Sequence, residues 1–125
     1  MKFTEHRDSN VYAVKHYEPD AVKINDQLLN DSCYLNQKEL VKEWGCHQVA
    51  DLNTELLDQL LSLKPEVILL GTGETQIFPD PQLFAYCSQH GVGLEVMNNL
   101  AACRTYNVLT TEDREVVLAL IMQKK

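Results

Sequence analysis

The feature that most constrains the fold of this chain is a run of four large apolar residues, 67–70, that ends in the sequence Gly71-Thr72-Gly73. An uninterrupted apolar run of this length is typical of a strand that is covered on both faces, as strands of parallel sheets are. The two glycines indicate a tight turn at the end of the strand. The fold class that this run predicts is therefore α/β, with helices packed against a parallel sheet.

Two helices with clear end signals flank this strand. The first is expected to begin at Asp51 or Asn53, both good N-cap residues, and to end before Pro65, with leucines along one stripe. The second begins with Asp80 as N-cap, has a proline in its first turn and ends at Gly91. Both segments fit helices that lie next to the strand in sequence and cover its sheet.

A second strand and a third helix complete the pattern. Residues 94–97 are a predicted strand, and Asn98 can cap a helix that runs to Val108. This alternation predicts parallel pairing through a right-handed crossover. Residues 116–122 fit a buried strand or a buried helix by periodicity, and their length and β-branched content favour a strand.

The first half of the chain has shorter segments separated by turns. Strands are predicted over residues 11–17, 21–24, 33–35 and 40–44, with a turn signal at residues 18–20. We expect these strands to form an antiparallel meander beside the α/β unit.

Length and charge narrow the class of protein. The length of 125 residues fits one domain, predicted to span residues 1–125. The net charge of −7, from 11 basic and 18 acidic residues, has the wrong sign for a nucleic-acid backbone or an anionic membrane surface. The first residues lack the apolar segment of a secretory signal, and the longest apolar run is too short for a bilayer. We therefore expect a cytoplasmic protein that binds no nucleic acid and does not insert into membranes.

The cysteines and histidines form no recognisable metal or catalytic motif. The cysteines are Cys33, Cys46, Cys87 and Cys103, without a Cys-x-x-Cys pair, and the histidines are His6, His16, His47 and His90. Free buried thiols are expected, with no metal and no cofactor. A nucleophilic role for Cys103 is the alternative, because Arg104 follows it, but no histidine is spaced to activate it. An inert, packed thiol is favoured.

The most site-like feature is the meeting of two strand ends. Ligands of open α/β sheets bind beyond the carboxyl ends of the strands, and residues 71–75 and 97–99 follow two such ends. The Gly-Thr-Gly turn could hold an anion with its N–H groups, although Glu74 would repel it, and a purely structural turn is favoured. Arg104 could bind a ligand carboxylate or pair with Glu74, and the pair is favoured.

Three segments of the second half resemble a known family. They are residues 68–76 (Ile-Leu-Leu-Gly-Thr-Gly-Glu-Thr-Gln), 91–97 (Gly-Val-Gly-Leu-Glu-Val-Met) and 101–109 (Ala-Ala-Cys-Arg-Thr-Tyr-Asn-Val-Leu). They are similar to the Mth-domain family of small, largely uncharacterised proteins, which includes a mitochondrial complex I assembly factor. The similarity covers residues 67–122 closely and residues 30–63 more loosely.

The resemblance implies a three-layer α/β fold: a central mixed sheet with parallel βαβ units, flanking helices and an additional antiparallel β layer. It also implies that residues 116–122 form a strand of the central sheet. Together with the strand ends, it predicts one cleft formed by Gly71, Thr72, Gly73, Glu74, Met97, Asn98, Arg104, Thr105, Tyr106 and Asn107.

Two functions from different classes follow from these observations. The favoured one is a non-enzymatic binding or assembly module with a protein partner, linked by the resemblance to respiratory complex assembly. It is favoured because no pair of carboxylates or other side chains has the spacing of an acid–base couple. The alternative is a small-molecule-binding protein or enzyme that uses the cleft between Gly71–Glu74 and Arg104. The sequence names no reaction and no ligand.

Overall fold

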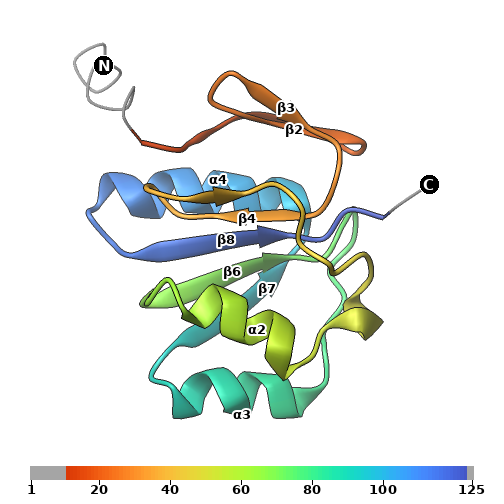
Figure 1. Cartoon of the computed structure of the whole chain (residues 1–125), viewed down its shortest axis with the longest axis vertical. Helices are drawn as coiled ribbons and strands as arrows, with labels where there is room; N and C mark the ends of the chain where they lie inside the picture. The colour runs from red at the N-terminus through yellow and green to blue at the C-terminus, as the bar shows by residue number, and fades with distance from the viewer. Residues whose placement is uncertain (1–10, 124–125) are drawn as a thin grey trace.

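The computed structural model describes residues 11–123, which form two sheets and the helices around them (Figure 1). The central sheet has five strands in the order β5-β4-β8-β6-β7. Their bounds are Leu40–Val41, Cys33–Leu35, Val116–Leu120, Val67–Gly71 and Gly93–Met97, respectively. The strand β6 pairs in parallel with β7 and β8, whereas β4 runs antiparallel to β8, so the sheet is mixed.

Three helices cover the two faces of this sheet. They are α2 (Thr54–Leu61), α3 (Pro81–Gln89) and α4 (Asn99–Thr111), and a short 3-10 helix, η1 (Val49–Asp51), precedes α2. Their predicted N-caps are confirmed: Asn53, Asp80 and Asn98 accept hydrogen bonds from the backbone N–H groups of Leu56, Gln82 and Ala101.

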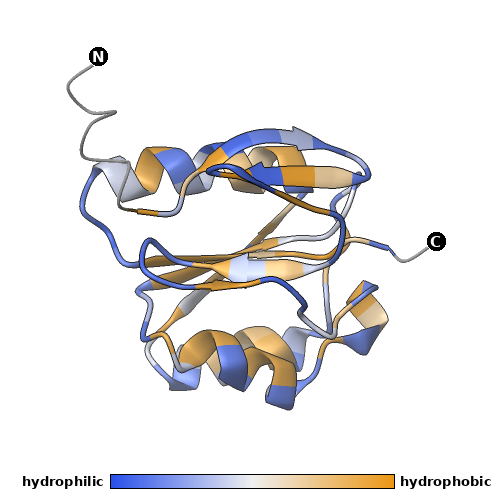
Figure 2. Ribbon diagram, turned by 45° about the horizontal axis from the view of Figure 1, so that its top comes forward, coloured by the Kyte–Doolittle hydropathy of each residue, from blue (hydrophilic) through white to orange (hydrophobic). Residues whose placement is uncertain are grey.

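The strand β6 is buried over its whole length, as the apolar run predicts. Ile68 and Leu70 point to the face covered by α2 and α3 and pack in one hydrophobic cluster. Val67 and Leu69 point to the opposite face and pack with Ala102 of α4 in a second cluster. Figure 2 shows the apolar sides of the helices turned toward the sheet. Burial on both faces therefore gives this strand an unbroken apolar sequence.

A second, antiparallel sheet lies on the outer side of α4. It has the order β1-β2-β3, with bounds Val14–Glu18, Ala21–Ile24 and Gln27–Leu29. The helix α4 therefore lies between two sheets and contacts β1 on one side and β6 and β8 on the other (Figure 1). This arrangement confirms the predicted α/β fold, with its central mixed sheet, flanking helices and additional antiparallel layer.

Some predicted elements differ in detail. The strands of the first half do not form one meander, because β4 and β5 join the central sheet while β1 to β3 form their own. The strand β3 was not predicted, since it has only three residues and ends a tight hairpin. The last predicted strand is confirmed as Val116–Leu120. His6 lies outside the described residues. Among residues 11–123, no helix is long and apolar enough to cross a membrane.

Candidate functional site

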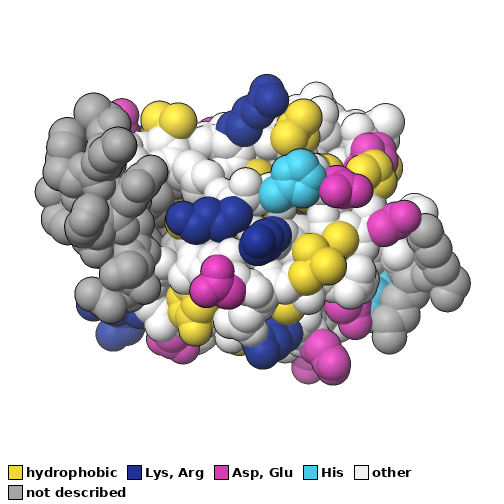
Figure 3. Space-filling model, turned by 90° about the horizontal axis from the view of Figure 1, so that it is seen from above, with side chains coloured by type: hydrophobic (Ala, Val, Ile, Leu, Met, Phe, Trp, Pro, Cys, Tyr) yellow, Lys and Arg dark blue, Asp and Glu magenta, His cyan; other side chains and the backbone are white. Residues whose placement is uncertain are grey.

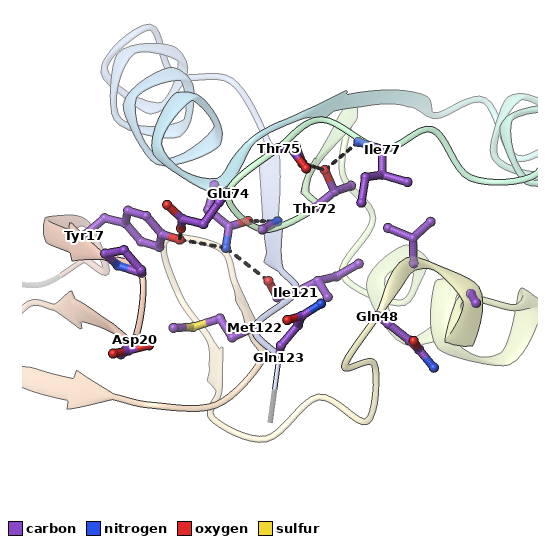
Figure 4. A pocket seen from close by; sticks show the side chains of 15 residues that line it. Tyr17, Asp20, Gln48, Thr72, Glu74, Thr75, Ile77, Ile121, Met122 and Gln123 are labelled. Carbon is purple, nitrogen blue, oxygen red and sulfur yellow. Dashed lines mark hydrogen bonds between the residues drawn. The ribbon is translucent and has the colours of Figure 1, made fainter. Parts of the chain in front are cut away.

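A pocket of about 530 Å³ lies beyond the carboxyl ends of β6 and β8 (Figure 4). Its walls come from five segments: the end of β1 and its turn, the η1 region, the loop after β6, the first residue of α4 and the chain after β8. The side chains that line it include Tyr17, Asp20, Gln48, Thr72, Glu74, Ile77, Asn99 and Ile121. The position agrees with the strand-end rule for open α/β sheets.

The buried side chain of Asn99 joins three of these walls. It is 1% exposed, and its Oδ1 accepts a hydrogen bond from the backbone N–H of Gly73 at 3.0 Å. Its Nδ2 donates to the carbonyl of Ile121 at 3.1 Å and to the hydroxyl of Tyr17 at 3.2 Å. All polar atoms of this amide are therefore satisfied inside the protein, and Asn99 acts as a structural link.

Tyr17 connects the antiparallel sheet to the pocket. Its hydroxyl donates a 2.6 Å hydrogen bond to Oε2 of Glu74, across 57 positions of sequence. Burial raises the pKa of Tyr17 well above its ordinary value of 10.0, and the hydrogen bond to Glu74 raises it further. The phenol therefore keeps its proton at neutral pH and holds the Glu74 carboxylate in a fixed position.

The conformation of the turn after β6 depends on two glycines and on the hydroxyl of Thr72. A Cβ on Gly71 would overlap Oδ1 of Asn99 and approach a methyl group of Leu120 to 2.8 Å. Gly73 has a φ of 99°, in the region that favours glycine. The hydroxyl of Thr72 donates to the carbonyl of Thr75 at 2.6 Å and accepts from the N–H of Ile77 at 3.0 Å.

These contacts decide between the two interpretations of the Gly-Thr-Gly turn. The N–H of Thr72 donates to the carbonyl of Met97, and the N–H of Gly73 donates to Asn99. Both groups that would bind an anion are thus committed to the protein. The structural interpretation is the one that the geometry supports.

The predicted cleft residues separate into three groups. Thr72, Gly73 and Glu74 line the pocket, and Gly71 lies directly behind it. The carbonyl of Met97 anchors the turn, and Asn98 caps α4 without lining the pocket. The remaining four residues lie roughly 1.4 to 2.2 turns beyond Asn99 along α4 and line no part of the pocket: Arg104, Thr105, Tyr106 and Asn107.

The predicted pair of Glu74 and Arg104 is wrong. Arg104 is exposed, and no ion pair joins it to Glu74 within residues 11–123. The hydroxyl of Tyr17 takes the place beside Glu74 that the guanidinium was expected to occupy. The physical reason is the placement of α4: position 104 lies about 7.5 Å along the helix from Asn99, and its side chain is on an exposed side of the helix.

Tyr106 and Asn107 hold the antiparallel sheet rather than a ligand. Tyr106 is fully buried, and its hydroxyl donates to the carbonyl of Tyr12 at 3.0 Å. The amide of Asn107 donates to the carbonyl of Val14 at 2.8 Å and accepts from the N–H of Val14 at 3.2 Å. This amide occupies part of the open edge of β1 as a neighbouring strand would. A smaller cavity of about 190 Å³ lies beside it.

The cysteines have no nucleophilic character. All four are buried, and burial raises the pKa of Cys33, Cys46 and Cys103 from 9.0 to about 12. A thiol of this kind is almost entirely protonated at neutral pH, so the inert interpretation of Cys103 holds. Among residues 11–123, no three His, Cys, Asp or Glu side chains are grouped so that they could hold a metal ion.

Sequence reasoning missed two residues that organise the pocket, Tyr17 and Asn99. Tyr17 belongs to the other sheet, and nothing local in the sequence indicates that it reaches Glu74. Asn99 lies in the predicted strand-end segment 97–99, but the helix cap was assigned to Asn98, and no separate role was predicted for Asn99. An asparagine at the first position of a helix indicates a role in the pocket only when it is known that the strand ends meet beside that helix.

Comparisons with known proteins agree with this architecture. Residues 14–121 match the family model described as "Protein of unknown function (DUF498/DUF598)". The chain is 30% identical over 118 residues to a Xenopus tropicalis protein called NADH dehydrogenase [ubiquinone] 1 alpha subcomplex assembly factor 3. That alignment covers 92% of this chain and 64% of the relative, so the chain spans less than two thirds of that protein's length.

Solved structures have the same fold. A Xanthomonas campestris protein determined by NMR is 42% identical, with a TM-score of 0.83 over 98% of this chain and 92% of its own. A Bordetella pertussis protein described as a Mth938-like domain is 28% identical, with a TM-score of 0.78 over 88% of this chain and 85% of its own. The family match over residues 14–121 includes every strand of the two sheets and the helices around them. The chain therefore belongs to the DUF498/DUF598 family.

Proposed function

We propose that this chain is a non-enzymatic protein-binding module that takes part in the assembly of a larger complex, and that it binds its partner at the pocket beyond β6 and β8. The observation that carries the proposal is an exposed apolar pair at the edge of this pocket. Ile77 is 48% exposed and Phe78 is 65% exposed, and both belong to the loop that follows β6. Large apolar side chains that are adjacent and exposed are typical of protein interaction sites.

The loop that carries this pair has a fixed structure. The N–H of Ile77 donates to the buried hydroxyl of Thr72, and the amide of Gln76 donates to the carbonyl of Val96 at 2.8 Å. Because the backbone is held on both sides of the turn, little conformational entropy is lost when a partner contacts the apolar pair. A preorganised loop of this kind suits a binding surface.

The chemistry of the pocket also supports binding rather than catalysis. Its described lining residues include no histidine, cysteine, lysine or arginine. The polar groups that do line it, such as Asn99 and the hydroxyls of Tyr17 and Thr72, are engaged in hydrogen bonds with the protein. A general acid or base must be placed to exchange a proton with a substrate. These amide and hydroxyl groups are already committed, so Oε1 of Glu74 would have to act without a histidine, cysteine, lysine or arginine of the pocket lining. The assembly-factor name of the Xenopus relative points in the same direction.

The experiment that tests this proposal is affinity capture from native lysate at low salt, followed by identification of the retained proteins. Wild-type chain should retain a defined subunit or factor of a multi-subunit complex. The double variant Ile77→Ser with Phe78→Ser should lose it. The control Leu28→Ser removes an apolar side chain that is 64% exposed on β3 and should retain the partner. Equal retention by all three chains would refute the proposal.

One observation favours the alternative function, a small-molecule site. The pocket volume of about 530 Å³ lies within the range of ligand-binding pockets. A thermal-shift screen with carboxylates, phosphates, amines and nucleotides separates the two functions, because a ligand of the folded state raises the melting temperature. A saturable shift that disappears in Glu74→Ala would favour the alternative.

A cytoplasmic location belongs to the same proposal. The acidic net charge of −7 supports it, since an anionic membrane surface repels such a chain. Cell fractionation with an antibody against the chain tests it directly. Recovery in the cytosolic fraction is expected, and recovery in a washed membrane fraction would contradict it.

A further inference from the structure

The pocket has an acidic side and an apolar side. Among its described lining residues, Asp20 and Glu74 are acidic and none is basic. In Figure 4, Asp20 and Glu74 lie on the side of Tyr17, whereas Ile77 lies on the side of Gln48. In Figure 3, several acidic side chains lie toward the right-hand end, and the visible Lys and Arg side chains lie over the middle and the left half.

No ion pair within residues 11–123 neutralises the charge of Glu74. The positive end of α4 begins at Asn99, but a helix terminus carries only about half a unit charge, against one full charge on Glu74. Arg104, the cation that the sequence analysis paired with Glu74, makes no ion pair with it. The negative potential therefore remains available to a ligand.

The Glu74 carboxylate is hydrogen-bonded through one of its two oxygens only. Its Oε2 accepts the hydrogen bond from Tyr17 at 2.6 Å, while its Oε1 makes no hydrogen bond or ion pair with any residue between 11 and 123. A carboxylate held at one oxygen and open at the other is suited to accept a hydrogen bond from an ammonium or guanidinium group.

We propose that the partner presents a short extended segment in which a lysine or arginine side chain pairs with Glu74, while an apolar side chain two positions away, on the same face of the segment, packs on Ile77 and Phe78. This inference rests on the proposed function and specifies the chemistry of the partner. The Glu74 carboxylate selects a positively charged side chain of the partner, and Ile77 and Phe78 supply most of the contact area. An acidic or phosphorylated segment is excluded from the pocket by the same carboxylates.

Two fluorescein-labelled peptides test the proposal, one containing Leu-Ser-Lys-Ser-Leu and the other Leu-Ser-Glu-Ser-Leu in otherwise identical uncharged sequences, so that the charged side chain and the leucines share a face of the extended segment. Binding is measured by fluorescence anisotropy at 50 and 300 mM salt. The lysine peptide should bind wild-type chain at least about threefold more tightly, which is the scale of a partly exposed ion pair, and the difference should shrink at high salt. Glu74→Gln should remove the preference, and Glu74→Lys should invert it.

Glu112→Gln is the matched control. It removes the same charge at the far end of α4, roughly 20 Å from Asn99 along the helix axis, and should leave the preference intact. Circular dichroism of each variant establishes that it is folded, and Gln at position 74 can still accept the hydrogen bond from Tyr17. Absence of binding by either peptide, equal binding of both, or a preference that survives Glu74→Gln would each overturn the inference.

The failure of this inference is distinguishable from failure of the proposed function. If Ile77→Ser with Phe78→Ser abolishes capture of the partner while Glu74→Lys leaves it unchanged, the surface binds protein and the proposed charge selection is wrong. If neither change affects capture, the partner does not bind at the edge of this pocket, and the proposed function fails as well.

Discussion

Gly71 and Asn99 are matched in size: the space that a Cβ on Gly71 would fill is occupied by Oδ1 of Asn99. That oxygen is at the same time the acceptor for the N–H of Gly73. The absence of a side chain at the end of β6 therefore allows the first residue of α4 to approach and bind the turn. The floor of the pocket depends on this contact.

Gly71→Ala should destabilise the fold by about 1–3 kcal/mol, because an added methyl group must displace the Asn99 amide or Leu120 in a packed interior. Gly45→Ala is the control, since a Cβ on Gly45 meets nothing within 4 Å, and its effect should stay within about 0.5 kcal/mol. Urea denaturation measures both. Equal stability of the two variants would contradict the packing argument.

Asn99→Ala should also destabilise the protein by about 1–3 kcal/mol, because it leaves the N–H of Gly73 and the carbonyl of Ile121 without their partner. Asn99→Asp keeps the acceptor for Gly73 but cannot donate to Ile121, so it should not restore wild-type stability. In amide hydrogen exchange, Gly73 should lose protection in Asn99→Ala and keep it in Tyr17→Phe. Unchanged protection of Gly73 in Asn99→Ala would show that its hydrogen bond contributes nothing.

The raised thiol pKa values predict behaviour at high pH. The unfolded chain releases thiol protons near pH 9, whereas Cys33, Cys46 and Cys103 hold theirs to about pH 12 in the folded state. Stability from these groups is complete below pH 9 and is lost as the pH rises toward 12, because the unfolded state then binds fewer protons.

A thiol reagent at pH 8 tests the same burial. Labelling of Cys33, Cys46 and Cys103 in the native chain should be at least about a hundredfold slower than in urea, since a thiol with a pKa of about 12 instead of 9.0 forms far less thiolate. Rapid labelling of Cys103 in the native state would contradict the inert assignment and reopen its role as a nucleophile.

The lowered pKa of Asp51 predicts that the folded protein loses stability at low pH. Its carboxylate accepts hydrogen bonds from the N–H of His47 at 3.0 Å and from the amide of Gln48 at 3.3 Å, and these lower its pKa below 3.8. Because the folded pKa is depressed, this stabilisation is present above the unfolded pKa and is lost as the pH falls through the folded pKa.

Asp51→Ala should therefore lower the urea midpoint at pH 7, and the difference from wild type should shrink at pH 3. Glu43→Ala is the control, an exposed carboxylate in the loop after β5, and should shift the midpoint little at either pH. A difference for Asp51→Ala that stays constant from pH 7 to pH 3 would show that the carboxylate charge is irrelevant.

The sequence predicted the α/β unit well because each of its elements carries its own local signals. The caps Asn53, Asp80 and Asn98 and the apolar run of β6 depend on neighbouring residues only. The arrangement of the first half was harder, since β3 and β5 have three and two residues and are defined by their partners. Membership of one sheet or the other is a tertiary property that local patterns do not contain.

The site was predicted in part for the same reason. The strand ends placed Thr72, Gly73 and Glu74 at the pocket, because topology alone brings them there. The hydrogen bond of Tyr17 to Glu74 joins different sheets, and the exposed direction of Arg104 depends on how α4 is rotated between them. Both are set by packing, and for this reason the predicted pair of Glu74 and Arg104 was wrong.

The central claim is that the loop at the edge of the pocket contacts a protein. Photo-crosslinking in cells that express the chain tests it most directly, with benzoylphenylalanine in place of Phe78, or of Val108 as an exposed apolar control on α4 that is 56% accessible. We predict one dominant crosslinked partner from position 78 that is absent from position 108 and is lost when Glu74→Lys is added. No crosslink from position 78, or the same crosslinks from both positions, would contradict the claim.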